Sequence, residues 1–395
     1  MFLVIFFWLS IFLIFYVYLG YPLLLVGIAY LGKPIQSDSK YLPSVTLLFS
    51  AYNEEKVIRN KIENSLSLDY PHKLLEILIV SDGSVDRTVE IARSFKSSLI
   101  RIIAFPERRG KLTAINDAIN TITNEIILFS DSDNYYKPDV IRSIVKYFSN
   151  PIVGAVSGGR NVIGESALGK TEGLYWKYEE FIKKNESRLD SCVGVAGDLL
   201  AIRRNLFVSP PTSIINDDFY IALSIIKQGF RVIYAPEARS SHPVASTEKG
   251  EIERRARMVA GRYQIIFSGW RILPFKRPIV LWQIISHKYL RPLVPFAMLF
   301  ALFINIIIVL QTDFNEKASL VHLSGNVPLF FLFLQLLFYF LAWFGGRVQK
   351  KNNILSRLLY LPVFLVNSNF AALIGLYRYL IKKQTVIWKK VREEV

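Results

Sequence analysis

The chain has 395 residues, of which 52% are hydrophobic, and its 48 Lys and Arg residues against 32 Asp and Glu residues give a formal net charge of +16. This length is sufficient for one large domain with additional elements. The single cysteine, Cys192, excludes an intrachain disulfide and fits a reducing compartment. Basic residues cluster near apolar segments and among aromatic residues, which favours contacts with membrane lipids and diphosphates over nucleic acid.

Residues 1–32 contain no charged residue and exceed the roughly 20 apolar residues that a helix needs to cross a bilayer. A secretory signal peptide would begin with basic residues and end at a small-residue cleavage site, and neither is found here. The segment is therefore predicted to be an uncleaved N-terminal transmembrane anchor.

Residues 292–310 and 327–344 are also uncharged and long enough to span a bilayer. Residues 358–376 form a weaker candidate, because an Asn-Ser-Asn stretch interrupts them, and we expect a re-entrant or interfacial segment there. The loop 347–357 is basic and has no acid, so it should face the cytoplasm. The chain is thus predicted to be an integral protein of the cell membrane whose soluble region, residues 33–248, is cytoplasmic.

Short apolar runs alternate with helix-like segments in this soluble region, which predicts an α/β domain with a parallel sheet. Strands are expected at residues 44–51, 76–80, 100–104, 125–129 and 230–234, and helices at 54–68, 86–95, 111–121, from 138, at 171–184 and at 216–228. Residues 249–291 are predicted to form a basic amphipathic or interfacial segment, and residues 292–395 a C-terminal transmembrane region with a basic tail.

Three short acidic motifs follow apolar runs, and open α/β sheets bind ligands at the carboxyl ends of their strands. They are Ser81-Asp82-Gly83-Ser84, Asp131-Ser132-Asp133 and Asn216-Asp217-Asp218. We expect these acids to meet around one divalent ion, because Mg²⁺ and Mn²⁺ prefer oxygen ligands and keep waters and substrate phosphates in their shells. Taken singly, each motif is also compatible with an ordinary strand–turn–helix junction or a solvated turn.

The pair Asp217 and Asp218 begins a predicted helix. Helix capping explains one acid at such a position but does not require two. Adjacent carboxylates separate each other's proton affinities, which suits a general base that must accept a hydroxyl proton.

Two basic features accompany the acids. Lys111 opens a predicted helix, and cations at a helix N-terminus favour phosphate, although a solvated basic turn is the alternative. Arg254, Arg255, Arg257 and Arg262 form a cationic stripe that suits either a departing diphosphate or a membrane surface. The four histidines, His72, His242, His287 and His322, lack metal-ligand spacing and are expected at the surface or the membrane interface.

In their order and spacing these motifs resemble the membrane-bound family-2 glycosyltransferases. The resemblance also includes Ala51-Tyr52-Asn53-Glu54-Glu55, Gly197, Arg203-Arg204 and Tyr234-Ala235-Pro236-Glu237-Ala238, and it covers nearly the whole chain. That group includes synthases of cellulose, hyaluronan and poly-N-acetylglucosamine, and single-sugar transferases that act on lipids.

The resemblance implies a GT-A fold for residues 33–248, which is a Rossmann-like mixed sheet, flanked here by transmembrane helices. It implies an inverting transfer by direct displacement from a nucleotide-sugar donor, preferably a UDP-sugar, with Mg²⁺ or Mn²⁺ as cofactor. By motif match, Asn53, Glu55 and Asp82 would hold the nucleoside, and Lys111 would touch the nucleotide or phosphate. Asp131 and Asp133 would handle the ribose, metal and diphosphate, and Asp218, beside Asp217, would be the base. Arg254 and Arg257 are assigned to the donor diphosphate from the chemistry of arginine.

The chain also departs from that pattern. Processive synthases carry Gln-x-x-Arg-Trp after the base, whereas this chain has Arg254-Arg255-Ala256-Arg257-Met258, in which only Arg257 matches. A single transfer to a lipid-linked or glycan acceptor is therefore expected. A processive polysaccharide synthase and a non-catalytic membrane scaffold are the alternatives. Asp198 stands where the family commonly has a small apolar residue, and the sequence explains no role for it.

Overall fold

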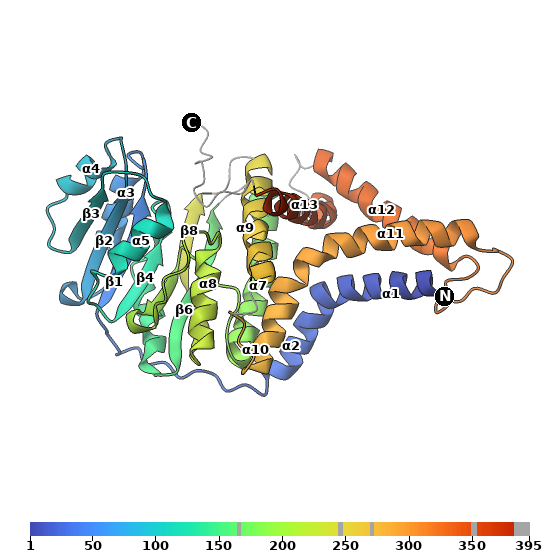
Figure 1. Cartoon of the computed structure of the whole chain (residues 1–395), viewed down its shortest axis with the longest axis horizontal. Helices are drawn as coiled ribbons and strands as arrows, with labels where there is room; N and C mark the ends of the chain where they lie inside the picture. Colours follow the sequence, from blue (N-terminus) through green and yellow to red (C-terminus); the bar gives the residue numbers. More distant parts are fainter. Residues whose placement is uncertain (164–166, 244–247, 269–271, 349–353, 383–395) are drawn as a thin grey trace.

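The computed structural model describes residues 1–163, 167–243, 248–268, 272–348 and 354–382. Figure 1 shows an α/β domain from which a group of long helices projects on one side. The basic tail from residue 383 onward and Lys350 and Lys351 of the basic loop, from which the membrane orientation was predicted, lie outside the described residues.

The domain is built on one mixed sheet, whose described strands follow the order β3-β2-β1-β4-β7-β6-β8-β5. Strands β1 to β4 run parallel, β7 runs antiparallel to both of its neighbours, β6 and β8 are parallel, and β5 is antiparallel to β8. The strands are β1 Val45–Ala51, β2 Leu75–Asp82, β3 Ile100–Phe105, β4 Ile126–Ser130, β5 Tyr135–Tyr136, β6 Val153–Ile163, β7 Leu200–Arg203 and β8 Arg231–Pro243.

Both faces of the sheet are covered by helices, so its strands are apolar on both sides. Leu47 and Phe49 of β1 pack on one face with α3 (Ile58–Leu66) and α6 (Val140–Val145). The alternate residue Leu48 packs on the other face with α5 (Lys111–Ile119) and α8 (Asp217–Lys227). This three-layer arrangement directs the carboxyl ends of β1, β2 and β4 to one edge.

The predicted elements of the first half are confirmed within a few residues, including α4 (Thr88–Ser94). The parallel arrangement expected for the first strands is found in β1 to β4, β7 is antiparallel, and the mixed GT-A-like sheet implied by the resemblance is confirmed. Strand β6 was not predicted, because its glycines interrupt the apolar pattern. They are needed for close packing, since a Cβ on Gly158 would lie 2.2 Å from Leu199 Cδ2.

Within the described residues, four stretches of helix are long and apolar enough to cross a membrane, which indicates membrane association. They are Phe2–Ala29, Pro278–Gln311, Val327–Arg347 and Leu361–Leu380. Phe7 of α1 (Phe2–Phe15) packs against Ala301 and Ile304 of α11 (Val294–Gln311), and its ring meets Phe331 of α12 (Val327–Val348). Large apolar side chains on the outer faces of these helices are exposed, as expected for a lipid-facing surface.

The last of these stretches belongs to α13 (Ile354–Leu380), which is one continuous helix with Pro362 inside it. Figure 1 shows it end-on, whereas α1, α11 and α12 run across the view, so α13 lies crosswise to them. It packs on α9 (Glu248–Ser268), where a Cβ on Gly375 would lie 2.7 Å from the Ala256 carbonyl oxygen, and Arg378 pairs with Glu253 at 2.7 Å.

Replacing Leu47 by Ala is expected to lower the free energy of unfolding by about 2–5 kcal/mol, because the side chain is fully buried in the central strand. The matched surface change, Val85→Ala, removes a side chain that is 85% exposed and should stay within about 0.5 kcal/mol of wild type. Equilibrium unfolding of the detergent-solubilised chain in urea measures both, and equal stabilities would contradict the assigned core.

Candidate active site

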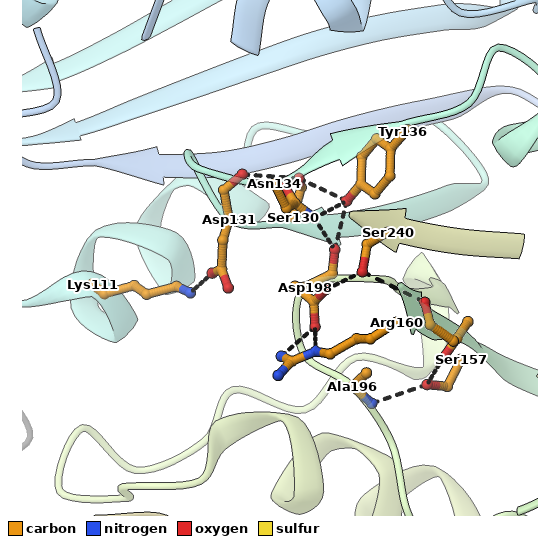
Figure 2. Close-up of polar contacts among 12 residues, drawn as sticks. Lys111, Ser130, Asp131, Asn134, Tyr136, Ser157, Arg160, Ala196, Asp198 and Ser240 are labelled. Carbon is orange, nitrogen blue, oxygen red and sulfur yellow. Dashed lines mark hydrogen bonds and ion pairs between the residues drawn. The ribbon is translucent and has the colours of Figure 1, made fainter. Parts of the chain in front are cut away.

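The Asp131-Ser132-Asp133 motif follows β4 and faces the start of α5. Lys111, the first residue of α5, donates from Nζ to Asp131 Oδ1 at 2.6 Å (Figure 2). Burial alone would raise the pKa of Asp131, but Lys111 holds this pKa below its ordinary value. The predicted phosphate-binding lysine and the predicted metal-binding loop therefore meet directly.

Lys61, a fully buried residue of α3, forms hydrogen bonds to residues at both ends of this loop. Its Nζ donates to Ser130 Oγ at 2.8 Å, to the Asn134 carbonyl oxygen at 2.8 Å and to Asn134 Oδ1 at 2.7 Å, and it lies 4.3 Å from the centre of the Tyr136 ring. Burial lowers the pKa of Lys61 to about 7. Because its partners lie on both sides of Asp131 and Asp133, Lys61 holds the ends of the turn that carries them.

Asp198, for which the sequence explained no role, is a buried partner of Arg160 on β6. Its Oδ1 accepts from Arg160 Nε at 2.8 Å and Nη2 at 2.5 Å, and its Oδ2 accepts from Ser240 Oγ at 2.5 Å (Figure 2). The Asp198 carbonyl oxygen also accepts from Tyr136 Oη at 2.5 Å and from Asn134 Nδ2 at 2.8 Å. The loop before β7 is thereby fixed against the Asp131 loop.

The acidic pair stands at the start of α8, as predicted, but it follows a loop rather than a strand. Gly197 packs against Asp218, so closely that a Cβ there would lie 3.1 Å from Asp218 Cβ. Burial and then the neighbouring charge of Asp217 raise the pKa of Asp218 to about 6. The side chain therefore combines a raised proton affinity with a position next to the Asp198 loop.

The arginines of α9, which were expected to form one cationic stripe, have different neighbours. Arg257 lies in the field of Asp217, Asp131 and Asp218; burial lowers its pKa, and these carboxylates oppose that change. Arg254 lies close enough to Arg257 to affect its charge. Arg255 instead points to α13, where Nη1 donates to Ser368 Oγ at 2.9 Å. Arg257 is thus on the site's side of the helix, and the assignment of Arg254 to the donor stays a prediction.

The residues predicted to hold the nucleoside link the loops that follow β1, β2 and β3. Both carboxylate oxygens of Asp82 accept backbone N–H groups at 2.8 Å, from Arg109 and Gly110, next to Lys111. Asn53 Oδ1 accepts the Val85 N–H at 3.0 Å, and Glu55 Oε2 accepts the Arg87 N–H at 3.2 Å. Their contact with a nucleoside stays a prediction.

A sharp turn at Gly83 follows β2. Its φ is +69°, and an added Cβ would lie 2.3 Å from the Arg108 nitrogen, so both the turn and the close approach require glycine.

Within the described residues, no three His, Cys, Asp or Glu side chains lie close enough to hold a metal ion by themselves. The expectation that acids from all three motifs surround one ion is therefore wrong for this part of the chain. The pair Asp131 and Asp133 still fits Mg²⁺ or Mn²⁺, which is commonly held by one or two carboxylates together with substrate phosphates and waters.

His287 is a second correction, because it is buried rather than at the surface. Its Nδ1 lies 2.7 Å from Glu186 Oε1 and its Nε2 lies 3.1 Å from Glu179 Oε2, both on α7 (Ala167–Leu189). Tyr21 of α2 (Tyr21–Ala29) donates to the same Glu186 oxygen at 2.7 Å. This network joins the α/β domain to the membrane helices, and no spacing in the sequence indicates it.

The chain is similar in sequence to known glycosyltransferases. Residues 46–208 match the family model described as Glycosyl transferase family 2. A poly-β-1,6-N-acetyl-D-glucosamine synthase of Staphylococcus epidermidis is 25% identical over 251 residues, which is 62% of this chain and 60% of the relative. The synthase of Staphylococcus aureus (strain COL) is 27% identical over 279 residues, 66% of this chain and 67% of the relative. The chain thus spans less than two thirds of the S. epidermidis relative.

Among solved structures, the mannosyltransferase PcManGT from Pyrobaculum calidifontis, in complex with GDP-Man and Mn²⁺, shares the fold with a TM-score of 0.73. The match covers 96% of this chain and 99% of that one at 21% identity. The long helices are therefore included in the shared architecture, along with the sheet.

Replacing Lys61 by Met should lower kcat/KM about tenfold or more, because the turn carrying Asp131 and Asp133 loses the donor of three hydrogen bonds. Lys56→Met, an exposed change just before the same helix, is the control and should leave the rate unchanged. Steady-state kinetics with a nucleotide-sugar donor, with circular dichroism to verify folding, makes the measurement. A folded Lys61→Met enzyme of wild-type activity would refute the supporting role.

Proposed function

We propose that this chain, which is a family-2 glycosyltransferase related to the poly-β-1,6-N-acetylglucosamine synthases, transfers one sugar from a nucleotide-diphosphate-sugar donor to a lipid-linked or glycan acceptor. The observation that carries this proposal is Asp218. It is a half-buried carboxylate with a pKa raised to about 6, in the same electrostatic environment as Arg257 and the Lys111–Asp131 pair.

In the proposed reaction Asp218 accepts the proton of an acceptor hydroxyl group. The hydroxyl oxygen attacks the anomeric carbon as the bond from that carbon to the donor diphosphate breaks, so the configuration inverts. Lys111 and Arg257 face the same acids and supply positive charge to the departing diphosphate. Asp217 keeps the proton affinity of Asp218 high enough for it to act as a base near neutral pH.

We assign Asn53, Glu55 and Asp82 to the nucleoside side, because they join the loops at the carboxyl ends of the first parallel strands. Asp131 and Asp133 would hold Mg²⁺ or Mn²⁺. When bound, the ion supplies positive charge to the diphosphate oxygens. The PcManGT structure contains Mn²⁺, which supports a divalent cofactor, and its GDP-Man makes a GDP-sugar the first donor to test beside UDP-sugars.

The α/β domain is proposed to lie on the cytoplasmic face of the membrane. Figure 1 shows the connection between α11 and α12 at the end remote from this domain, near the N-terminus, and α12 returns toward the domain. The remote loop holds Asp313 and Glu316, whereas the near end of α12 carries Arg347 at the start of the basic loop. Basic loops face the cytoplasm. The crosswise direction of α13 supports an interfacial position for that helix.

A processive polysaccharide synthase is the second candidate, supported by the similarity to the two staphylococcal enzymes. The absent Gln and Trp near Arg257 favour a single transfer, because those groups would hydrogen-bond to and stack on an acceptor chain. The match to a glycosyltransferase family argues against a non-catalytic scaffold. Mass analysis of the product from a labelled-donor screen decides between them, since one added sugar supports the proposal and a polymer contradicts it.

Asp218→Asn should reduce kcat by about two to four orders of magnitude, because an amide cannot accept the hydroxyl proton. Binding of the nucleoside diphosphate should be nearly unchanged, and calorimetry with Mn²⁺ checks it. Asp313→Asn, in the loop between α11 and α12, is the matched control and should retain full activity. Undiminished turnover in Asp218→Asn would exclude this residue as the base.

The pH profile provides an independent test of the same group. Since the base must be deprotonated, kcat/KM should fall as the pH drops below about 6, the pKa of Asp218. Asp217→Asn removes a like charge that raises this pKa, so the acid limb should move to lower pH. An unchanged limb in an active Asp217→Asn enzyme would show that another group limits the rate.

A further inference from the structure

Four cations gather on the membrane side of Asp218, in the space between α7, α9 and the helical turns that precede α11. They are Lys183 of α7, Arg262 of α9, Lys288 of the π-helical turn Ile285–Tyr289 and Arg291 of the following turn, and we call them the cation cluster. Lys288 lies in the electrostatic field of the other three. Lys183 and Lys288 also flank the same point, since a Cβ on Gly194 would lie 3.1 Å from Lys183 Cε and 3.2 Å from Lys288 Nζ.

The cluster has few anions of its own. Lys183 is 5% exposed, and in the described part of the chain it, Lys288 and Arg262 have no hydrogen bond or ion pair. Lys183 meets only ring faces, with Nζ 5.8 Å from the centre of Trp176 and 5.6 Å from that of Tyr234. A buried ammonium group without an acceptor is costly, and natural proteins rarely keep one unless it binds something.

Arg291 provides the second sign of an absent anion. Its side chain is nine-tenths buried and its Nη1 pairs with Glu179, yet Nε and Nη2 have no partner among the described residues. Glu179 is also shared with His287, and Glu186 is used by His287 and Tyr21. The acids of α7 that face the cluster are therefore already engaged, and positive charge remains in excess.

The position of the cluster identifies which anion it suits. The charge of Lys288 acts on Asp218. Lys111 instead pairs with Asp131, and Arg257 lies in the field of Asp131 and of the acidic pair. The cluster is thus adjacent to the proposed base but separate from the lysine and arginine assigned to the donor diphosphate. Lys288 and Arg291 also lie directly before residues 292–310, an uncharged helical run long enough to cross a bilayer, so a ligand bound here can extend an apolar tail into the membrane.

We infer that the cation cluster binds the phosphate or diphosphate group of a lipid-linked acceptor and thereby presents the acceptor's reacting hydroxyl to Asp218. This inference rests on the proposed function and narrows its acceptor to an anionic lipid. Lysine suits phosphate as a point charge, and the unpaired edge of the Arg291 guanidinium can donate two hydrogen bonds to phosphate oxygens.

Calorimetry on the full chain in an uncharged detergent tests the inference, with farnesyl diphosphate as the probe. EDTA is added so that no divalent ion recruits the probe to the donor site. Farnesyl diphosphate should bind, and the double variant Lys183→Met with Lys288→Met should weaken its binding at least tenfold. Lys177→Met, an exposed change on the same helix, is the matched control and should bind as wild type does.

Two comparisons separate the possible sources of the anion. Farnesol, which has the tail without the charge, should bind at least tenfold more weakly than farnesyl diphosphate. Inorganic diphosphate, which has the charge without the tail, should also bind more weakly. Equal affinity for inorganic and farnesyl diphosphate would overturn the lipid assignment, and equal affinity of wild type and the double variant for farnesyl diphosphate would overturn the site.

Folding and donor binding are measured on the same variants. The double variant should be at least as thermally stable as wild type, because it removes two charges that lack partners in the described structure, and the charge of Lys183 is buried. Its affinity for UDP and for GDP with Mn²⁺ should be unchanged, and a parallel loss would assign the cluster to the donor instead. If no sugar transfer is found while lipid binding still depends on the cation cluster, the proposed function is refuted but the lipid-binding site is not. Transfer with an unaltered acceptor KM in the double variant would overturn this inference alone.

Discussion

Repulsion between aspartates is the constraint on which this site depends. Asp131, Asp198, Asp217 and Asp218 approach one another at one edge of the sheet, where burial strengthens the repulsion. Two of them have a cation of their own, because Lys111 pairs with Asp131 and Arg160 pairs with Asp198. Asp217 and Asp218 have no ion pair in the described structure, and burial and then the charge of Asp217 raise the pKa of Asp218. Of these two carboxylates, Asp218 is the one with the raised pKa, and its proposed chemistry needs a raised proton affinity.

Helix α9 couples this chemistry to the membrane helices. On one side Asn216, directly before the acidic pair, donates to the Met258 carbonyl oxygen at 2.8 Å, and Gly261 leaves the space that its side chain fills. On the other side Glu253 pairs with Arg378 of α13. A displacement of α13 would therefore shift α9 and, through Asn216, the start of α8. The acceptor side of the site is built from elements that also contact the membrane segments.

The sequence alone was sufficient to predict secondary-structure elements that have a periodic apolar pattern and to select candidate site residues that belong to a motif. Alternating strands and helices predicted the first four strands, and Lys111, Asp131 and Asp218 were selected as candidates because each stands at an element boundary. Lys61 could not be found, since a lysine in a helical pattern looks solvent-exposed until α3 is placed under the Asp131 loop. His287 and its partners on α7 lie about 100 residues apart in the chain, so only the fold brings them together. The positions of the residues that the resemblance assigned to the nucleoside are now defined, while their role stays a prediction.

The distribution of cations bears on the kind of acceptor. A synthase that extends a neutral polysaccharide needs positive charge for the donor diphosphate, and Lys111 with Arg257 already lies on that side. It has no use for a second group of unpaired cations beyond the base, and burying them would only destabilise the junction with the membrane helices. Lys183 and Lys288 occupy that position nonetheless. Two cationic regions on either side of Asp218 suit a reaction in which donor and acceptor each carry phosphate. This charge pattern, together with the altered motif around Arg257, favours a single transfer onto an anionic lipid over chain elongation.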